Sequence, residues 1–339
     1  MTRLIDVANA AEVSLSTASR VMNGSDYPVR PDVRNKILLA ADMLGYENAK
    51  SRQSKKTMDI GVLIPNITNP FYPQMILGIE SVALDYSSNI FVCSTLRNRD
   101  REQQYLKLLY EKKVEGVIIS SVDKKAEYLS KYIQKGMKFV LLDQKIDNAN
   151  CPYINYNPYD GARKAVKTLL DYGHRDTVFI TTPLTRWTRQ EVFRGFREEL
   201  ESSGVSFNSE MVFELREEKE GVNEGYELSA GQALCKMYLK SKVKATAALC
   251  VNDMVAFGFM QEIQRSGLKI PDDISVIGFD DIPMSSLVYP PLTTVRQNTY
   301  ECGRLAAKML FEQVLDKEDY SFTVSLEPQI MIRESIRRI

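Results

Sequence analysis

From residue 60 onward, short runs of apolar residues alternate with longer segments in which apolar residues recur every three or four positions. The short runs are continuously apolar, which is typical of strands buried on both faces of a parallel sheet. They read IGVLIP, NIFVCS, GVIISS, KFVLLD, TVFITT, TAALCVND and ISVIGFDD. Because so long a segment exceeds one sheet of ordinary size, the alternation predicts two α/β units, each with helices on both faces of its sheet.

Residues 1–46 differ from the rest, because they show helical periodicity without a strand signal. Ser14 is a suitable N-cap for a helix over 15–22, which follows a tight corner. In that helix the apolar side chains fall on one face, whereas small polar residues and Arg20 fall on the other. This pattern is typical of a helix-turn-helix unit, although a small helical cap with a solvated face would show the same periodicity.

Charge is distributed unevenly between the two parts of the chain. Residues 1–56 contain nine basic and six acidic side chains, whereas the whole chain contains 44 of each. The zero net charge excludes a uniformly basic nucleic-acid coat protein. The N-terminal excess has the sign expected of a DNA-facing head on a neutral body. A helix of such a head fits the major groove, where an arginine can donate two hydrogen bonds to guanine.

Several classes of protein are disfavoured by what the sequence lacks. No apolar stretch is long enough to cross a bilayer, and Asp6 and Glu12 interrupt the N-terminal segment, so we expect no secretory signal. The five cysteines lack CxxC spacing, as expected of reduced thiols in a cytoplasmic protein. His174 is the only histidine, which disfavours a metal site and favours a hydrogen-bonding role. Nucleotide-binding and nucleophile motifs are missing, so we expect neither an enzyme nor a cofactor.

The segment RLIDVANAAEVSLSTASRVMNG resembles the opening of the lactose-repressor/galactose-repressor (LacI/GalR) family, whose heads read approximately T-x-x-D-V-A-x-x-A-G-V-S-x-x-T-V-S-R-V-L-N. Two positions depart from that pattern, since Glu12 replaces the usual turn glycine and Ala18 the usual valine. The resemblance implies an all-α helix-turn-helix head in which some side chains read bases and others hold phosphates. These are Leu15, Ser16 and Arg20 for the bases, and Thr17 and Asn23 for the phosphates.

Residues 47–59 depart most from the family, which usually has a hinge that becomes helical on DNA and inserts a leucine into the minor groove. Here Ser51 and Ser54 occupy the usual alanine and leucine positions. A serine is poorly suited to unstack a base step. We therefore hypothesise a basic linker that contacts phosphates with little kinking of the DNA, while a flexible solvated tether is an equally good interpretation. The basic side chains of this linker are Lys50, Arg52, Lys55 and Lys56.

The resemblance covers nearly the whole chain, because DYGHRDTVFIT and VNDMVAFGFMQEIQRSGLKIPDDISVIGFDDIPMSSLVYPPLTTVRQ are also close to family sequences. The family's core resembles periplasmic sugar-binding proteins, in which two doubly wound subdomains are joined by three crossing strands and a ligand lies in the cleft. This implies an effector-binding and dimerisation core over 60–339. Its first subdomain would comprise about 60–157 plus 295–321, and its second about 158–294 plus 322–339.

Polar and aromatic residues follow several predicted strands, at the edge where α/β sheets bind ligands. Carboxylates and amides beside aromatic rings suit a polyhydroxylated ligand, because acceptors fix hydroxyl groups and rings cover C–H surfaces. Structural roles stay open for two pairs, helix capping for Asn252-Asp253 and loop stabilisation for Asp280-Asp281. The positions that match the family's effector contacts are Phe71, Tyr72, Asp143, Tyr156, Asn252, Asp280 and Gln297.

One anchor of the family's effector site is absent. The family often has an arginine three residues before the glycine of a G-F pair, where this chain has Val192 before Gly195. Arg186 and Arg189 lie just upstream. We hypothesise that one of them makes an anionic contact, which favours a sugar acid or a sugar phosphate, and we include Arg189 among the effector contacts. Two surface arginines on a loop are the alternative.

Together these observations predict a cytoplasmic, sequence-specific DNA-binding regulator of transcription, a repressor of carbohydrate or sugar-acid metabolism genes. A small carbohydrate-like effector in the cleft would change operator affinity allosterically. A homodimer is expected, with contacts partly through 71–83 and without a C-terminal heptad helix for a tetramer. A sugar receptor for transport and an α/β enzyme are the alternatives, and salt-dependent binding to DNA separates the regulator from both.

Overall fold

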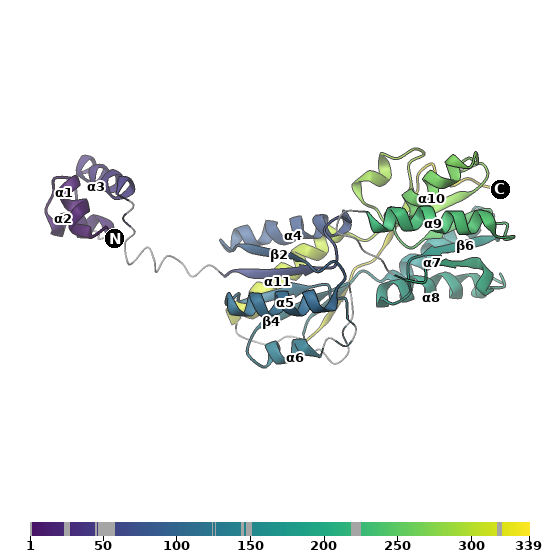
Figure 1. Cartoon of the computed structure of the whole chain (residues 1–339), viewed down its shortest axis with the longest axis horizontal. Helices are drawn as coiled ribbons and strands as arrows, with labels where there is room; N and C mark the ends of the chain where they lie inside the picture. The colour runs from purple at the N-terminus through teal and green to yellow at the C-terminus, as the bar shows by residue number, and fades with distance from the viewer. Residues whose placement is uncertain are drawn as a thin grey trace. The chain divides into compact units, whose positions relative to one another are not determined.

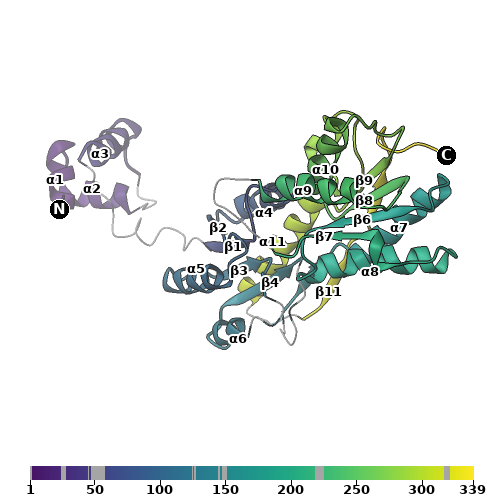
Figure 2. The ribbon, with the colours of Figure 1, turned by 45° about the vertical axis from the view of Figure 1, so that its right-hand side comes forward.

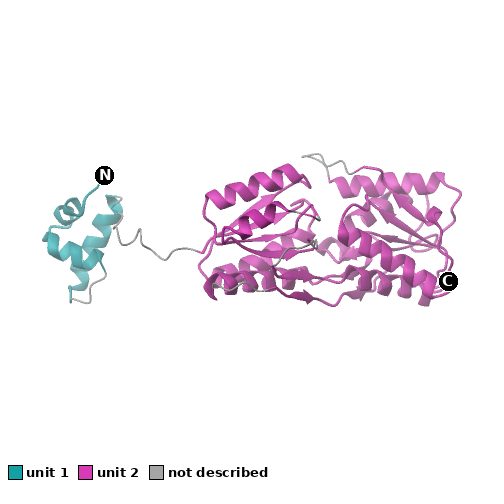
Figure 3. Cartoon of the chain, turned by 90° about the horizontal axis from the view of Figure 1, so that it is seen from below, with its two compact units in different colours: residues 1–57 teal, residues 58–339 magenta. Residues whose placement is uncertain are grey.

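The chain divides into two compact units, Met1–Thr57 and Met58–Ile339 (Figure 3). The computed structural model describes residues 2–23, 28–44, 46, 58–123, 125, 127–143, 146, 151–217, 225–316 and 321–339. Each unit has a hydrophobic core of its own, and the two are described separately.

The first unit, the head, contains three helices, α1 (Leu4–Ala10), α2 (Leu15–Met22) and α3 (Pro31–Met43). Ser14 caps α2, because its hydroxyl oxygen accepts the backbone N–H of Thr17 at 3.1 Å. The corner between α1 and α2 holds Glu12 at a φ of 54°, in the left-handed region that favours glycine. The three helices meet around eight buried side chains, Val7, Ala8, Ala11, Ala18, Val21, Ile37, Ala40 and Ala41.

The second unit, the core unit, alternates strands and helices, as the apolar runs predicted. Its strands are β1 (Ile60–Ile64), β2 (Ile90–Ser94), β3 (Gly116–Ile119), β4 (Lys138–Leu142), β5 (Tyr153–Asn155), β6 (Thr177–Thr181), β7 (Val212–Glu214), β8 (Ala247–Cys250), β9 (Ser275–Asp280), β10 (Thr293–Arg296), β11 (Thr323–Ser325) and β12 (Gln329–Met331). Its helices are α4 (Phe71–Asp85), α5 (Arg99–Glu111), α6 (Tyr128–Ile133), α7 (Pro158–Asp171), α8 (Trp187–Ser202), α9 (Tyr226–Lys240), α10 (Asp253–Arg265) and α11 (Thr299–Asp316), with short 3₁₀ turns at Ser209–Met211 and Pro283–Ser286.

The strands form two separate sheets with helices on both faces (Figures 1 and 2). The first sheet has the order β11-β5-β4-β3-β1-β2 and is parallel throughout. The second has the order β12-β10-β9-β8-β6-β7, and β12 is antiparallel to β10 at its edge. Parallel sheets require helices to cover both faces, which explains the continuously apolar runs in the sequence.

Alternate side chains of β1 serve opposite faces of the first sheet. Ile60, Val62 and Ile64 pack with α4 and α11, whereas Leu63 packs with α5 and α6. In the second subdomain α7 and α8 pack on one face of the sheet and α9 and α10 on the other (Figure 1). The contact between α9 and α10 is close, since a Cβ atom on Gly258 would lie 2.0 Å from the backbone oxygen of Leu228.

The chain crosses between the sheets three times, after β5, after β10 and after β11. Asn157 lies at the first crossing with a φ of 50°, and its side chain caps α7. The third crossing comes later than predicted. Strand β11 pairs with β5 in the first sheet, so the chain returns to the second subdomain after residue 325 and not at 322. The exposed, short strand carries little apolar sequence to signal this pairing.

Candidate ligand pocket and nucleic-acid interface

Helix α2 of the head presents small polar side chains around its N-terminus. The Ser14 hydroxyl lies 2.9 Å from that of Ser16 and 2.7 Å from that of Thr17. Leu15 is 47% exposed, and Ser16, Arg20 and Asn23 are also exposed, while Thr17 is half-buried. Four of the five side chains of the head that are predicted to contact DNA are therefore exposed, and all five lie on α2 or at its C-terminal end. Lys50, Arg52 and Lys55, the predicted phosphate contacts of the linker, lie outside the described residues.

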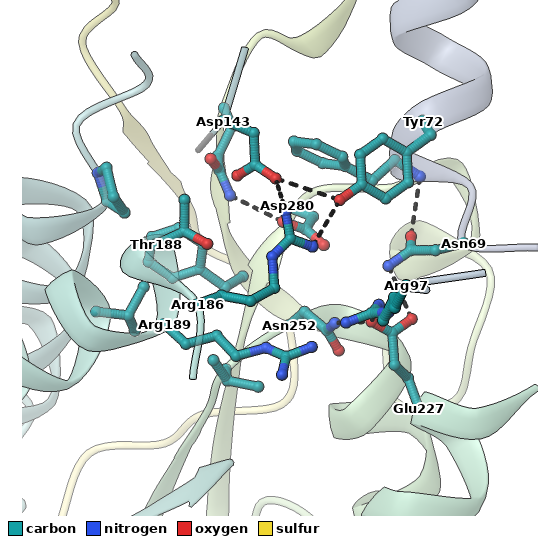
Figure 4. Close-up of a pocket in the computed structure, with 16 residues that line it drawn as sticks. Asn69, Tyr72, Arg97, Asp143, Arg186, Thr188, Arg189, Glu227, Asn252 and Asp280 are labelled. Atoms are coloured by element: carbon teal, nitrogen blue, oxygen red, sulfur yellow. Dashed lines mark hydrogen bonds and ion pairs between the residues drawn. The ribbon is translucent and has the colours of Figure 1, made fainter. Parts of the chain in front are cut away.

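A pocket lies in the core unit where strands of both sheets end (Figure 4). Both subdomains contribute charged, amide and aromatic side chains to it, which is the composition predicted for a polyhydroxylated ligand. Seven of the eight predicted effector contacts line it, namely Phe71, Tyr72, Asp143, Arg189, Asn252, Asp280 and Gln297.

Tyr156 is the predicted contact that does not line this pocket. It is only 1% exposed and packs edge-to-face against Phe71, with 5.5 Å between the ring centroids. The structure therefore places Tyr156 behind Phe71, in the hydrophobic core that contains α4. A strand-end position alone could not distinguish a side chain in the pocket from one beneath it.

The first charged cluster of the pocket is built around Asp143, which follows β4. Its Oδ2 atom accepts hydrogen bonds from Arg186 Nη2 at 2.6 Å, from Ser120 at 3.0 Å and from Tyr72 at 3.2 Å. Arg186 also donates to the Tyr72 hydroxyl at 3.1 Å. Burial raises the pKa of Tyr72 to about 12, so this hydroxyl stays protonated at neutral pH.

The second charged cluster is built around Glu227, near the start of α9. Arg97 Nη2 donates to Glu227 Oε1 at 2.6 Å, and Asn252 donates to the same oxygen at 2.9 Å. Asn69 donates to the other carboxylate oxygen, Oε2, at 2.9 Å. Asn252 also caps α10, because its side-chain oxygen accepts the N–H of Val255 at 2.8 Å. Capping and pocket lining are thus combined in one residue.

Asp280 lines the pocket, whereas the nearby carboxylates Asp253 and Asp281 stabilise the surrounding loops. Gln297 donates to Asp280 at 2.8 Å inside the pocket. Burial, and then the negative charges of Asp253, Glu227 and Asp143, hold the pKa of Asp280 well above its usual range.

Two neighbouring carboxylates are structural. Asp253 accepts the N–H of Ile282 and the hydroxyls of Ser285 and Thr294. Asp281 pairs with Arg296 at 2.6 Å and with Arg333 at 2.5 Å. The loop-stabilising role considered for Asp280-Asp281 therefore belongs to Asp281.

Three charged residues of the pocket have left-handed backbone conformations. The φ angles are 56° at Arg97, 61° at Asp143 and 129° at Asp280. Such conformations cost about 1–3 kcal/mol at a residue other than glycine and concentrate at functional sites. The fold thus holds these three side chains in the pocket at the expense of stability, which favours a functional role over a structural one.

Arg186 and Arg189 are not surface arginines on a loop, because they are only 7% and 6% exposed. Arg186 precedes α8 and reaches the opposite subdomain, and its Nε atom is buried without a partner in the described residues. Arg189 donates to the backbone oxygen of Pro183 at 3.0 Å. Both arginines line the pocket, as does Val192 at the position of the absent family anchor.

Three residues that line the pocket are not among the effector contacts predicted from the sequence, namely Asn69, Arg97 and Glu227. Asn69 and Arg97 follow β1 and β2, so polar residues after these strands were a usable signal. Glu227 lies inside the first turn of a helix, where an acidic residue is ordinarily explained by the helix dipole.

His174 has the structural role predicted for it. Its ring nitrogens lie 2.9 Å from the Thr246 hydroxyl and 2.9 Å from the backbone oxygen of Arg337, which ties the C-terminal segment to the second subdomain. Within the described residues, no group of three or more potential ligands is placed to hold a metal ion. No helix in the described part of the chain has the length and apolar character needed to cross a membrane.

Comparison with known proteins matches both units. Residues 3–48 match the family model described as bacterial regulatory proteins, lacI family, and residues 166–336 match the periplasmic binding protein-like domain. The HTH-type transcriptional regulator RegA of Clostridium saccharobutylicum is 31% identical over 340 residues, which cover 98% of this chain and 99% of that protein.

Solved structures resemble the chain over most of its length. The lac repressor dimer bound to operator and the anti-inducer ONPF has a TM-score of 0.79 at 25% identity, covering 99% of both chains. A LacI family transcriptional regulator from Enterococcus faecalis V583 with bound ribose has a TM-score of 0.72 at 28% identity, covering 83% of this chain and 99% of that one. The fold class predicted from the sequence is confirmed, as is the family resemblance.

Proposed function

We propose that this chain, which belongs to the LacI family of bacterial regulatory proteins, is a repressor whose affinity for operator DNA is set by a small carbohydrate-like molecule in the pocket of the core unit. Transcriptional regulation follows from the family. We propose three further points, namely that the chain represses transcription, that its effector is carbohydrate-like, and that its target genes belong to carbohydrate or sugar-acid metabolism.

The head supports operator binding by a homodimer. Helix α2 exposes hydroxyls and Arg20 on one surface, and a helix of this size fits the major groove. One head offers little contact area, so two heads on two half-sites are needed for a specific affinity. The lac repressor, which is similar over the whole chain, is a dimer on its operator.

The pocket supports a carbohydrate-like effector. Asp143, Glu227 and the amides beside them offer acceptors and donors for hydroxyl groups, and Phe71 and Phe279 offer ring surfaces. Arg186 and Arg189 favour an acidic sugar or a sugar phosphate among these molecules. The related Enterococcus faecalis regulator holds ribose, which is a sugar of the expected chemistry.

One observation carries the proposal, namely that side chains of both subdomains converge on one pocket beside the crossings. A molecule held there contacts both subdomains, so it can favour one of their arrangements over another. A differential affinity of this kind is what an effector needs to change operator binding.

Operator binding is tested by selecting preferred sequences from a random DNA pool with the full chain. We expect affinity to fall with rising salt concentration, because phosphate contacts release counterions. Arg20→Ala should weaken binding to the selected site by about 1–3 kcal/mol, the worth of a bidentate contact to guanine. Arg265→Ala, which removes an exposed arginine of the core unit, is the matched control and should change nothing.

The effector is tested by measuring operator affinity against neutral sugars, sugar acids and sugar phosphates. At least one of them should shift the affinity, and Arg189→Ala should reduce the response to an acidic one. Salt-dependent operator binding that ignores the entire panel would contradict the carbohydrate-like effector. An absence of DNA binding would favour the transport receptor instead.

A further inference from the structure

The two charged clusters of the pocket are both bridges between the subdomains. Asp143 belongs to the first subdomain and its partner Arg186 to the second, whereas Arg97 belongs to the first and its partner Glu227 to the second. Each subdomain therefore contributes one arginine and one carboxylate, and each ion pair has a separation of 2.6 Å. Figure 4 shows Arg186 and Asp143 near the centre of the view and Arg97 and Glu227 to their right.

Both pairs are buried and supported by neutral groups. The paired side chains are 8% exposed at Arg186 and Asp143 and 6% exposed at Arg97 and Glu227. Further hydrogen bonds cross the cleft, among them one from Asn69 to Glu227 and one from Arg186 to the Tyr72 hydroxyl. Tyr72 in turn donates to Asp143 within the first subdomain. Among the other described ion pairs, most join exposed side chains, which contribute little to stability.

We propose that Arg186–Asp143 and Arg97–Glu227 form a latch that holds the two subdomains closed without help from an effector. The effector then acts by exchanging partners with the latch, since its oxygens need the same arginines, amides and carboxylates. This inference rests on the proposed function for its link to DNA, and on the observed ion pairs for the latch itself.

Charge reversal should have a much larger effect in the buried pairs of the latch than in an exposed ion pair. Reversing one charge of a buried pair leaves two like charges facing each other in a poorly hydrated site, which is strongly unfavourable. Separation of the subdomains relieves this cost by admitting water. Restoring opposite charges in the reversed order should therefore restore closure, because the attraction does not depend on which subdomain carries the arginine.

The test measures the separation of the subdomains by single-molecule energy transfer in the full chain, without added sugar. Fluorophores are placed on Gln104→Cys of α5 and Ala233→Cys of α9, two exposed positions, whereas the five native cysteines are buried. Labelled chains are diluted into unlabelled chains so that each dimer carries one pair. The variants are Arg97→Glu, the charge swap Arg97→Glu/Glu227→Arg, and Lys107→Glu as a control within an exposed pair of α5.

The parent should show a predominantly closed distribution. Arg97→Glu should raise the open fraction at least tenfold, the charge swap should return most of it, and Lys107→Glu should leave it unchanged. A folded Arg97→Glu variant with the parent's distribution, or a charge swap as open as the single variant, would overturn the latch. Glu227→Gln, which keeps the shape and removes the charge, gives the same test with a smaller shift if Arg97→Glu does not fold.

Operator affinity of the same variants separates the latch from the proposed function. A larger open fraction of the subdomains together with a change of tenfold or more in operator affinity supports both the latch and the proposed function. Opening without any change in affinity supports the latch and contradicts effector control of DNA binding through the cleft. An unchanged separation overturns the latch whatever the DNA result.

Discussion

Helix α2 of the head, which is predicted to face DNA, rests on a core of eight side chains, five of which are alanine. The pocket of the core unit instead lies between two sheets whose cores include many fully buried phenylalanine, isoleucine and leucine side chains. Large apolar side chains contribute most of the free energy of burial, and alanine contributes little. The head therefore has a small margin of stability, whereas the core unit can tolerate buried charges and strained backbone.

The two units also place their functional side chains differently. In the head most of the predicted contacts are exposed and all of them lie on α2 or at its end, so loss of this helix would remove the predicted contact surface. In the core unit the charged residues of the pocket are buried and paired with one another, so the proposed latch predicts that a single substitution changes the arrangement of the subdomains before it changes the fold. The difference predicts which substitutions destroy function through unfolding and which through conformation.

The largest effect is expected from Ile37→Ala in the head. Ile37 is fully buried and is the largest side chain of its small core. Its truncation should cost about 2–5 kcal/mol, which is a large part of what a small domain possesses. Circular dichroism should show loss of the head's helices, and operator binding should disappear, while unfolding of the core unit stays unchanged.

Leu39→Ala on the same helix is the matched control. Leu39 is 63% exposed, so its truncation should change stability by no more than about 0.5 kcal/mol. If Ile37→Ala left the head folded and binding intact, the contrast in stability between the two units would be wrong.

Gly258→Ala should produce the next largest effect, confined to the core unit. The added Cβ atom would lie 2.0 Å from the backbone oxygen of Leu228, so α9 and α10 must separate. Overpacking of this kind costs about 1–3 kcal/mol. Urea unfolding followed by tryptophan fluorescence reports on this unit, because Trp187 is the only tryptophan. Gly225→Ala, whose Cβ atom would make only an ordinary contact at 3.9 Å, should unfold near the parent's midpoint.

Glu12→Gly should stabilise the head by a smaller amount. Glycine removes the left-handed strain of Glu12, which is worth about 1–2 kcal/mol. Part of this gain in stability is offset, because glycine increases the conformational entropy of the unfolded chain. The variant also loses an exposed ion pair to Lys36 at 3.1 Å, which is worth little. A net gain of about 0.5–1 kcal/mol is expected in the thermal unfolding of the head. A loss of stability would show that the pair with Lys36 matters more than the strain.

The contrast between the units also explains how much the sequence could predict. The head was predictable because its helices are local, and the left-handed corner coincides with the position where the family has glycine. The alternation of strands and helices predicted both sheets, and strand ends predicted most of the pocket. These features depend on local patterns and on the rule that parallel strands end at a common edge.

The pairings across the cleft could not be predicted in the same way. Arg97 and Glu227 are far apart in the sequence, and neither carries a local sign of its partner. Tyr156 was misplaced because depth below the pocket depends on packing around Phe71. The pairing of β11 with β5 joins distant segments with little apolar pattern. Each of these features is a long-range contact that a single sequence does not encode locally.

The smallest effect concerns pH and returns to the comparison of the two units. Burial lowers the pKa of His174 below its ordinary value of 6.5, so the unfolded chain binds a proton more readily than the folded core unit. The contribution of His174 to the stability of this unit should therefore fall as the pH drops below 6.5. Burial raises the pKa of Asp253 to about 6, and the contribution of Asp253 to stability has the opposite sign, because it is lost as the pH rises from 3.8 to about 6.

The effect of His174 is measured by comparing the urea midpoints of the parent and of His174→Gln at pH 5 and 7, since Asp253 is common to both. On acidification the stability of the parent relative to that of the variant should fall, and only in the core unit, because the head contains no histidine. Equal losses in parent and variant would mean that His174 is as easily protonated in the folded chain as in the unfolded one.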